Sequence, residues 1–254
     1  MSKTLFGVFA LVRQLSKYFL TAMQIDAKDV KAIIPFKKEG AKSRLGDFFS
    51  ESEREELALS MLKDVLAALS YSKIEEVEII STSSLDGDGL VKEAQLNGAK
   101  ATLTVSVRED ERGLNEVLNE IIADEKEPVL IIMADVPLTT PESINEILEH
   151  EEAEVVIVPG RKGGTNALFL RNPYAFHVSY YGMSFSAHVE TAKRRNLSLA
   201  VHDSFFISAD IDEVEDLIEL LIHGQGFSAD YLRRIGVGLQ EDKNSKSRAV
   251  VNRK

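Results

Sequence analysis

The feature that most constrains the fold of this chain is a regular alternation of short apolar segments with longer amphipathic ones. We predict strands at residues 30–36, 77–82, 101–107, 128–137, 153–160, 165–171 and within 199–212. The amphipathic segments repeat apolar residues three and four positions apart, as helices with one buried face do. We predict these helices at residues 50–69, 90–99, 113–125, 186–195 and 213–224, with another that starts at Thr140. The alternation indicates βαβ units, and hence an α/β protein whose mostly parallel sheet carries helices on both faces.

Two of the helices carry clear start signals. Ser50 with Glu53 three residues later has the sequence pattern of a capping box. Thr140 suits an N-cap, and Pro141 is favoured at the first position of a helix.

The whole alternating region reads as one domain. The chain has 254 residues, 44% of them hydrophobic, which suffices for one large α/β core, and no repeat or linker divides it. We place the domain at residues 27–238. Residues 1–26 are predicted to be an extension, best read as an amphipathic helix, although a signal peptide or a true start at Met23 are alternatives. The polar, locally basic residues 239–254 are predicted to be a flexible tail.

Composition excludes several classes of function. A net charge of −11 argues against a general nucleic-acid binder, which needs a basic face. The chain has no cysteine, and therefore no disulfide, thiolate zinc site or cysteine nucleophile. No apolar run approaches the roughly 20 residues that span a bilayer. We therefore expect a cytoplasmic protein with neither nucleic acid nor membrane as a partner.

Three acidic residues stand where a parallel sheet binds its ligands, which is beyond the carboxyl ends of the strands. Asp135 follows the apolar run of residues 129–134, and Asp210 and Asp212 are predicted to end another strand. Carboxylates that converge in this way suit Mg²⁺, which completes its coordination with phosphate oxygens and water. The alternative is that each is a helix cap or a loop acid.

A basic segment, residues 35–48, comes at the end of the first predicted strand and just after it. It contains Lys37, Lys42 and Arg44, with Ser43 as a small donor. Recognition of a triphosphate requires such donors. The spacing is not that of a Walker A loop, and a solvated basic loop is the alternative.

Two further segments offer small and hydroxyl-bearing residues. Gly164 and Thr165 lie in a glycine-rich turn, where backbone can approach a ligand, although a plain hairpin turn explains the glycines equally well. Ser184 or Ser186 could cap the helix that follows, and a helix start of this kind binds phosphate or carboxylate. The histidines show no metal-binding spacing, and neither a G-x-S-x-G elbow nor a G-x-G-x-x-G fingerprint after the first strand is present.

Five segments taken in order resemble the nucleotide-diphospho-sugar transferase-like fold, a GT-A or Rossmann-like fold of nucleotidyltransferases. They are AIIPFKKEGAKSRL, ADVPL, GGTNALF, SFSAH and ADIDEVEDL. The closer resemblance is to the 2-phospho-L-lactate guanylyltransferase family of archaeal coenzyme F(420) synthesis, and it covers roughly residues 30–224. The KKEGAKSRL loop is as in that family, whereas sugar nucleotidyltransferases usually carry a more glycine-rich loop there.

The resemblance implies an enzyme that converts GTP and (2S)-2-phospholactate to lactyl-2-diphospho-5′-guanosine and pyrophosphate. It also implies roles for the candidate residues. Asp135, Asp210 and Asp212 would hold Mg²⁺, and Lys42 and Arg44 would neutralise the triphosphate. Thr165 and Ser186 would hold the phosphate or carboxylate of the acceptor, and Asn115 would contact the nucleoside. Lys37, Ser43, Gly164 and Ser184 complete the predicted substrate-binding set. Lys42, Arg44 and Asp135 form the predicted catalytic set, and a homodimer is the family expectation.

Other functions remain open at this point. The acceptor could be phosphoenolpyruvate or 3-phosphoglycerate, or a sugar phosphate or molybdopterin, although the small predicted pocket disfavours bulky acceptors. A catalytically silent nucleotide-binding domain is disfavoured by three intact carboxylates. A glycosyltransferase would carry a D-x-D motif directly after a central strand, whereas the Asp210–Asp212 pair lies late in the chain.

Overall fold

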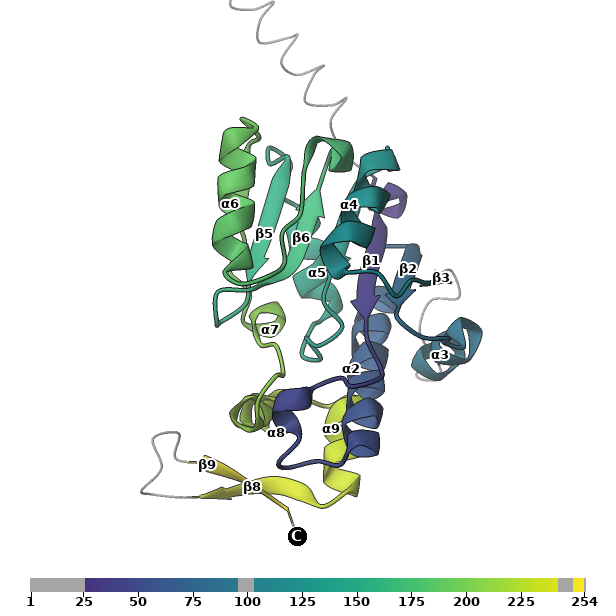
Figure 1. Cartoon of the computed structure of the whole chain (residues 1–254), viewed down its shortest axis with the longest axis vertical. Coiled ribbons are helices and arrows are strands. Elements are labelled where there is room, and N and C mark those ends of the chain that lie inside the picture. The colour runs from purple at the N-terminus through teal and green to yellow at the C-terminus, as the bar shows by residue number, and fades with distance from the viewer. Residues whose placement is uncertain (1–25, 96–102, 242–248, 254) are drawn as a thin grey trace, which may run out of the picture.

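The computed structural model describes residues 26–95, 103–241 and 249–253, in which a seven-stranded sheet lies between helical layers (Figure 1). Its strands are β1 (Lys31–Phe36), β2 (Glu76–Ser81), β3 (Thr104–Glu109), β4 (Val129–Ile132), β5 (Val155–Pro159), β6 (Thr165–Leu170) and β7 (Leu199–Val201). The spatial order is β3-β2-β1-β4-β6-β5-β7. Only β6 runs antiparallel to its neighbours β4 and β5, so the predicted mostly parallel sheet is confirmed.

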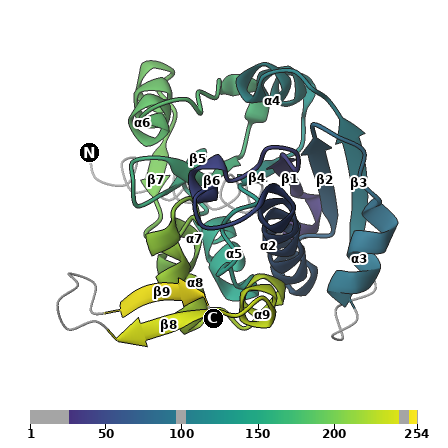
Figure 2. The same ribbon diagram turned by 60° about the horizontal axis from the view of Figure 1, so that its bottom comes forward.

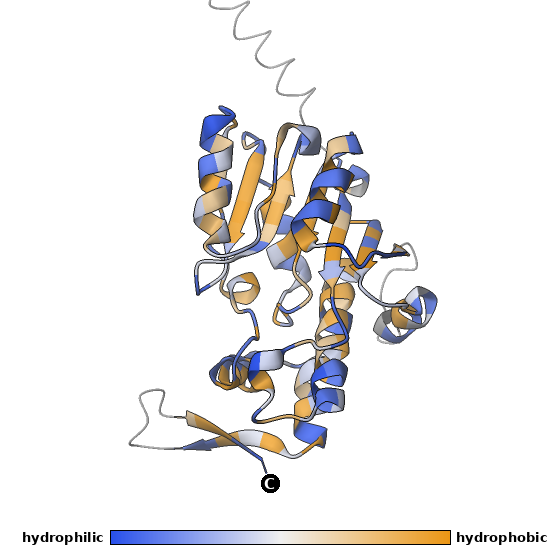
Figure 3. Cartoon of the chain, in the orientation of Figure 1, coloured by the Kyte–Doolittle hydropathy of each residue, from blue (hydrophilic) through white to orange (hydrophobic). Residues whose placement is uncertain are grey.

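Helices cover both faces of the sheet, as predicted. The long helices are α2 (Glu51–Tyr71), α3 (Gly87–Gln95), α4 (Leu114–Asp124), α5 (Pro141–Leu148) and α6 (Ser184–Arg194). Successive strand residues point to opposite faces, so Ile33 packs in the core beneath α4 and α6, while Ile34 packs with α2 and α5. Strand β4 is buried along its whole length, in keeping with its unbroken apolar sequence. Strand β5 is similarly apolar, as its orange colour in Figure 3 shows.

Shorter elements complete the described fold. They are the 3-10 turns η1 (Ala27–Asp29), η2 (Ser43–Leu45), η3 (Pro173–Ala175) and η4 (Val214–Asp216), and the helices α7 (Phe205–Ser208), α8 (Leu217–His223) and α9 (Phe227–Arg234). Both predicted helix starts are confirmed: Ser50 and Glu53 form a capping box, and Thr140 caps α5 with Pro141 in its first turn. None of the helices in the described ranges is both long and apolar enough to span a membrane.

The prediction of a flexible tail from residue 239 is wrong for its described parts. Strands β8 (Val237–Glu241) and β9 (Ala249–Arg253) pair as an antiparallel hairpin beside α8 and α9 (Figure 2). Val251 is buried in the main core, and Arg253 forms an ion pair with Glu53 at the start of α2. The predicted extension at residues 1–26 lies outside the described residues, apart from Asp26.

The region of residues 199–212 also differs from the prediction. Strand β7 ends at Val201, and Ser204 then caps the short helix α7 by accepting a hydrogen bond from the Ile207 N–H. Asp210 and Asp212 therefore lie in a loop after α7 and do not end a strand. Helix α9 was not predicted from the sequence.

Helix α9 is held by a buried carboxylate from α2. Asp64 is 7% exposed and accepts hydrogen bonds from the backbone N–H groups of Phe227 (2.6 Å) and Ser228 (3.0 Å), and from the Ser228 hydroxyl. It thus caps the start of α9 from another helix. Burial is the largest influence on this group and raises the pKa of Asp64 to about 6, against the opposing hydrogen bonds from Ser228 and Phe227.

This raised pKa predicts a pH dependence of stability. Between pH 3.8, the ordinary value, and about pH 6, the folded chain keeps a proton on Asp64 that the unfolded chain has released. The contribution of Asp64 to the free energy of unfolding is therefore largest at low pH and declines by about 3 kcal/mol as the pH rises through this window. Chemical denaturation of the wild type and Asp64→Asn from pH 4 to 7 measures it, because the difference between them isolates Asp64. A constant difference would contradict the prediction, and Asp124→Asn serves as the control at an exposed position.

Candidate active site

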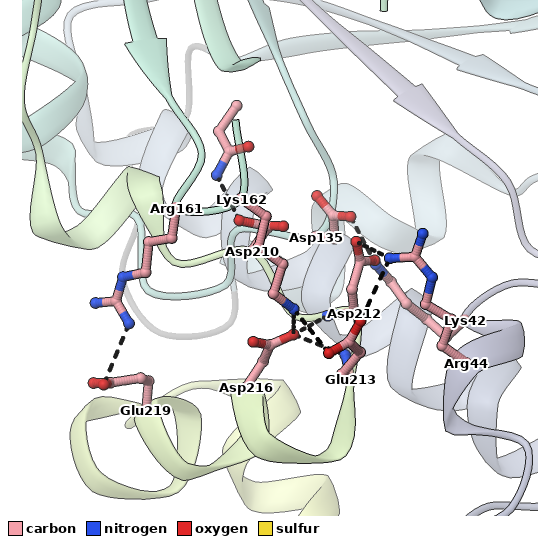
Figure 4. Close-up of polar contacts among 11 residues, drawn as sticks. Lys42, Arg44, Asp135, Arg161, Lys162, Asp210, Asp212, Glu213, Asp216 and Glu219 are labelled. Atoms are coloured by element: carbon pink, nitrogen blue, oxygen red, sulfur yellow. Dashed lines mark hydrogen bonds and ion pairs between the residues drawn. The ribbon is translucent and has the colours of Figure 1, made fainter. Parts of the chain in front are cut away.

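The candidate site lies where β1 and β4 end, between the loop after β1 and the loop that follows α7 (Figure 4). Lys42 sits in the first loop with a left-handed backbone (φ 53°). Its ammonium group donates hydrogen bonds to Asp135 Oδ2 at 2.6 Å and to Asp212 Oδ1 at 2.8 Å. Burial alone would lower the pKa of Lys42, but the two carboxylates outweigh burial and raise it. Lys42 is therefore a charged group shared by two of the predicted acids.

The loop of residues 209–213 brings the other acids to Asp135. The Ile211 N–H donates to the backbone oxygen of Asp135 at 3.0 Å, which joins the two loops. Asn166 donates to Asp210 Oδ1 at 3.2 Å, while Arg44 lies 3.6 Å from Asp212 Oδ2. The predicted convergence of the three acids is thus present, although it is produced by a loop and not by a strand end.

The charges of these acids influence one another. Burial raises the pKa of Asp210, and the charges of Asp135 and Asp212 add to that rise. Burial acts in the same direction on Asp212, but Lys42 outweighs it and lowers the pKa of Asp212. Within the described ranges, no group of three or more His, Asp or Glu side chains is arranged to hold a metal ion.

Asp216 fixes the backbone of the acid-bearing loop. Its Oδ2 accepts hydrogen bonds from the N–H groups of Asp212 (2.9 Å) and Glu213 (2.7 Å), and from the Lys162 ammonium (3.0 Å). Lys162 belongs to the turn between β5 and β6, so this contact ties that turn to the acids. Figure 4 shows the same arrangement, with Arg161 of the turn paired to Glu219 on α8.

A cavity of about 230 Å³ adjoins the acids on the side of α2. Its walls are the end of β1 with the following loop, including Lys37 and Lys42, the α2 residues Ala58 and Met61, and residues 133–135. Ser43 and Arg44 lie next to it in the exposed turn η2. The cavity thus has an apolar floor, cations on one wall and Asp135 at its edge.

The second group of predicted residues surrounds the turn between β5 and β6. Gly163 has a left-handed backbone (φ 85°), which favours glycine, and its oxygen accepts a hydrogen bond from the Phe185 N–H at the start of α6. Gly164 and Thr165 follow it. The Met133 N–H donates to the backbone oxygen of Asn166 at 2.9 Å, so this turn lies directly beside the end of β4 and near Asp135.

The two serines do not cap α6, contrary to the prediction. The N-cap is Met183, which makes no side-chain cap, so that Ser184 and Ser186 occupy the first and third helical positions. Ser184 is buried, whereas Ser186 is exposed. Asn115 lies on α4, and its side-chain oxygen accepts a hydrogen bond from the Tyr180 N–H at 2.7 Å, so it braces the segment that leads to α6.

Three contacting residues were missing from the predicted set. Asn166 holds Asp210, Lys162 ties the turn to Asp216, and His188 contacts the Thr165 hydroxyl at 2.9 Å. Asn166 and His188 lie in the segments GGTNALF and SFSAH, beside predicted residues, which is the signal that could have identified them. No pattern in the sequence indicates the partner of Lys162.

Comparison with solved structures identifies the fold class. A structure classed as a nucleotide-diphospho-sugar transferase from Desulfovibrio desulfuricans G20 superposes with a TM-score of 0.62 at 18% identity, covering 82% of this chain and 95% of that chain. The 4-diphosphocytidyl-2C-methyl-D-erythritol synthase of Anaerococcus prevotii DSM 20548 gives 0.52 at 17% identity, covering 84% and 99%. The predicted nucleotide-diphospho-sugar transferase-like fold is confirmed.

Sequence comparison then gives the family. A 2-phospho-L-lactate guanylyltransferase of Methanosarcina mazei is 45% identical over 203 residues, which cover 80% of this chain and 91% of that protein. One from Methanocella arvoryzae is 42% identical over 221 residues, covering 87% and 92%. Residues 30–254 match the family described as Guanylyl transferase CofC like. The chain belongs to this family of nucleotidyltransferases, as the resemblance predicted.

Proposed function

We propose that the chain transfers GMP from GTP to (2S)-2-phospholactate, giving lactyl-2-diphospho-5′-guanosine and pyrophosphate, in the biosynthesis of coenzyme F(420). The names of its relatives support the reaction. The structural observation that carries the proposal is the cluster of Lys42, Asp135 and Asp212 beside a cavity at the carboxyl end of the sheet.

The proposed transfer of GMP needs no strong general acid or general base from the protein. An oxygen of the acceptor phosphate attacks the α-phosphorus of GTP, a new P–O bond forms, and the bond to the pyrophosphate oxygen breaks. A phosphate monoester is already a nucleophile at neutral pH, so the protein must chiefly align two anions and neutralise charge. The cations and acids of the site suit this task, and no covalent intermediate with the protein is needed.

The donor chemistry of the three acids suits a divalent cation, although their side chains are not arranged around one here. Asp135, Asp210 and Asp212 offer hard carboxylate oxygens of the kind that Mg²⁺ prefers. The Lys42 ammonium already lies between two of these carboxylates and balances their negative charge, as a bound cation would. We therefore propose that Asp135, with one or both of the other two acids, holds Mg²⁺. When bound, Mg²⁺ would neutralise phosphate oxygens of the substrates.

The remaining predicted residues divide between the two substrates. We assign the cavity and the cations Lys37, Lys42 and Arg44, with Ser43, to the nucleotide, because its anionic chain needs cations next to an apolar floor. Asn115 stays a proposed nucleoside contact. We assign the phosphoacid to Gly164, Thr165, Ser184 and Ser186, because this group lies beside Asp135 and joins the start of a helix to a glycine turn.

Some finer features also remain proposals. Phosphoenolpyruvate and 3-phosphoglycerate are the alternative acceptors, since both are three-carbon phosphoacids.

We also propose that the protein acts as a cytoplasmic homodimer, on the basis of the family resemblance. Size-exclusion chromatography with light scattering measures the oligomeric state, and a monomeric mass at the working concentration would refute the dimer.

Pyrophosphate release tests the proposed reaction. The full chain with Mg²⁺ is given each of the four NTPs, with and without 2-phospholactate, phosphoenolpyruvate or 3-phosphoglycerate. We expect release only with GTP and one phosphoacid, most strongly 2-phospholactate, and loss of release in EDTA. A preference for another phosphoacid would correct the acceptor, and a preference for another NTP would correct the base. The absence of release with every pair would refute the guanylyltransferase activity.

A further inference from the structure

His188 of α6 is a buried histidine with a hydrogen bond at each ring nitrogen. Its side chain is fully buried, with Tyr180 (4.9 Å between ring centroids) and Phe176 (5.9 Å) packed against the imidazole. Nε2 accepts a hydrogen bond from the Ser179 N–H at 2.9 Å, and Nδ1 lies 2.9 Å from Thr165 Oγ1. Of these two neighbours, Thr165 belongs to the proposed phosphoacid site, and Ser179 lies in the segment that leads to α6.

These two contacts determine which nitrogen carries the proton. A backbone N–H can only donate, so Nε2 must be the unprotonated, accepting nitrogen. The neutral ring then has its hydrogen on Nδ1 and donates it to Thr165 Oγ1. Burial supports the neutral form, because it lowers the pKa of His188 to about 4.

The hydroxyl of Thr165 is constrained in turn. Its oxygen receives the hydrogen from His188, so its own hydrogen must point toward another acceptor. In the described part of the chain, the Thr165 side chain makes one hydrogen bond, the contact with His188. Thr165 follows Gly164 in the turn that is hydrogen-bonded to the start of α6, and its side chain faces that helix, whereas the next side chain, Asn166, donates to Asp210.

We propose that His188 is a positioning residue, which turns Thr165 into an obligate hydrogen-bond donor for an anionic oxygen of the second substrate. The Ser179 N–H fixes the tautomer of His188, and the His188 Nδ1–H then donates to the Thr165 hydroxyl oxygen. The hydroxyl hydrogen of Thr165 is left to donate to a phosphate or carboxylate oxygen. This inference rests on the proposed function only in assigning that anion to the three-carbon phosphoacid. It explains why a fully buried, neutral histidine follows the serines at the start of α6.

Two substitutions of His188 separate its two hydrogen bonds. His188→Asn keeps an N–H near the position of Nδ1 and loses the acceptor for Ser179, whereas His188→Gln keeps an acceptor near Nε2 and loses the donor to Thr165. We expect His188→Gln and Thr165→Val to raise the KM for the phosphoacid roughly 10- to 100-fold, with the KM for GTP changed less than threefold. His188→Asn should recover most of the phosphoacid KM. The double variant His188→Gln/Thr165→Val should be no worse than Thr165→Val.

The control is Thr191→Val, which removes another buried hydroxyl from α6 and should leave both KM values unchanged. Thermal denaturation identifies any variant that fails to fold, and Thr165→Val then tests the inference without a change in the histidine. Equal rises in the KM for GTP and for the phosphoacid, or a loss of kcat alone, would show that His188 only supports the fold and would overturn the proposal.

Two measurements separate this inference from the proposed function. Long-range ¹H–¹⁵N NMR spectra of the wild type report the tautomer directly, and an Nε2–H tautomer for His188 would overturn the inference even in an active enzyme. If the wild type releases no pyrophosphate with any pair, the proposed function fails, and calorimetry with inorganic phosphate still decides the inference. Phosphate binding at least tenfold weaker in Thr165→Val supports it, whereas equal affinity in wild type and variant overturns it.

Discussion

Asp135→Asn is expected to lower the turnover number for pyrophosphate release by about three orders of magnitude, because the variant keeps the side-chain shape and loses the carboxylate charge. Asp135 shares the Lys42 ammonium with Asp212, and its backbone oxygen accepts a hydrogen bond from the Ile211 N–H. The substitution leaves that backbone contact intact, so the fold should persist. Steady-state kinetics with saturating GTP and phosphoacid measure the loss.

The control for this experiment is Asp124→Asn. Asp124 is the last residue of α4 and lies near Lys31 at the start of β1, away from the end of that strand where the site is, and the change in net charge is the same. It should retain the wild-type turnover number, and thermal denaturation of both variants should give similar midpoints. A turnover number near that of the wild type in Asp135→Asn would remove this residue from the mechanism.

Lys42→Met is expected to lower the stability of the metal-free protein and to increase the stabilisation that Mg²⁺ provides. Without Lys42, the carboxylates of Asp135 and Asp212 face each other unbalanced, and the free energy of unfolding should fall by about 1–3 kcal/mol. The same change vacates the position of the ammonium, 2.6 and 2.8 Å from the two acids. Mg²⁺ without nucleotide should therefore stabilise the variant more than it stabilises the wild type. Turnover should fall roughly 100- to 1,000-fold, because a cation for the triphosphate is lost.

The measurement is the midpoint of thermal unfolding at increasing Mg²⁺, with and without GTP. Lys38→Met is the matched control, since it removes one charge from the same loop, and among the described residues the ion pairs of Asp135 and Asp212 are made by Lys42 and Arg44. An equal rise in the midpoint with Mg²⁺ in wild type and Lys42→Met would show that the ammonium and the metal do not compete for the carboxylates.

The parts of the fold that could be predicted are the strands and helix starts whose structure depends on residues within the same short segment. The unbroken apolar run of β4 predicts a strand buried on both faces, and the side chains of Ser50 and Thr140 mark helix starts through contacts three residues away. The hairpin of β8 and β9 was missed because its register depends on a partner strand, and Val251 alone of β9 is buried in the core. Helix α7 was missed although its cap, Ser204, was visible in the sequence.

The site was predictable in its location and less so in its internal contacts. The rule that ligands bind beyond the carboxyl ends of parallel strands is sufficient to place Asp135. The contact between Lys42 and Asp135 joins residues 93 positions apart, and it depends on a left-handed backbone at Lys42 that nothing in the sequence signals. The tautomer of His188 likewise depends on Ser179 and Thr165, from two separate segments that only the folded chain brings together.

The cap that Asp64 provides for α9 has a consequence for the order in which the protein can fold during synthesis. Asp64 and Ser228 lie 164 residues apart, so α2 leaves the ribosome long before the partners of its buried carboxylate exist. Until then, the face of α2 that α9 covers stays in contact with water or with chaperones. Helix α2, which forms one wall of the cavity beside Asp135, therefore reaches its final packing only when nearly the whole chain has been made, and a nascent chain is not yet a complete enzyme.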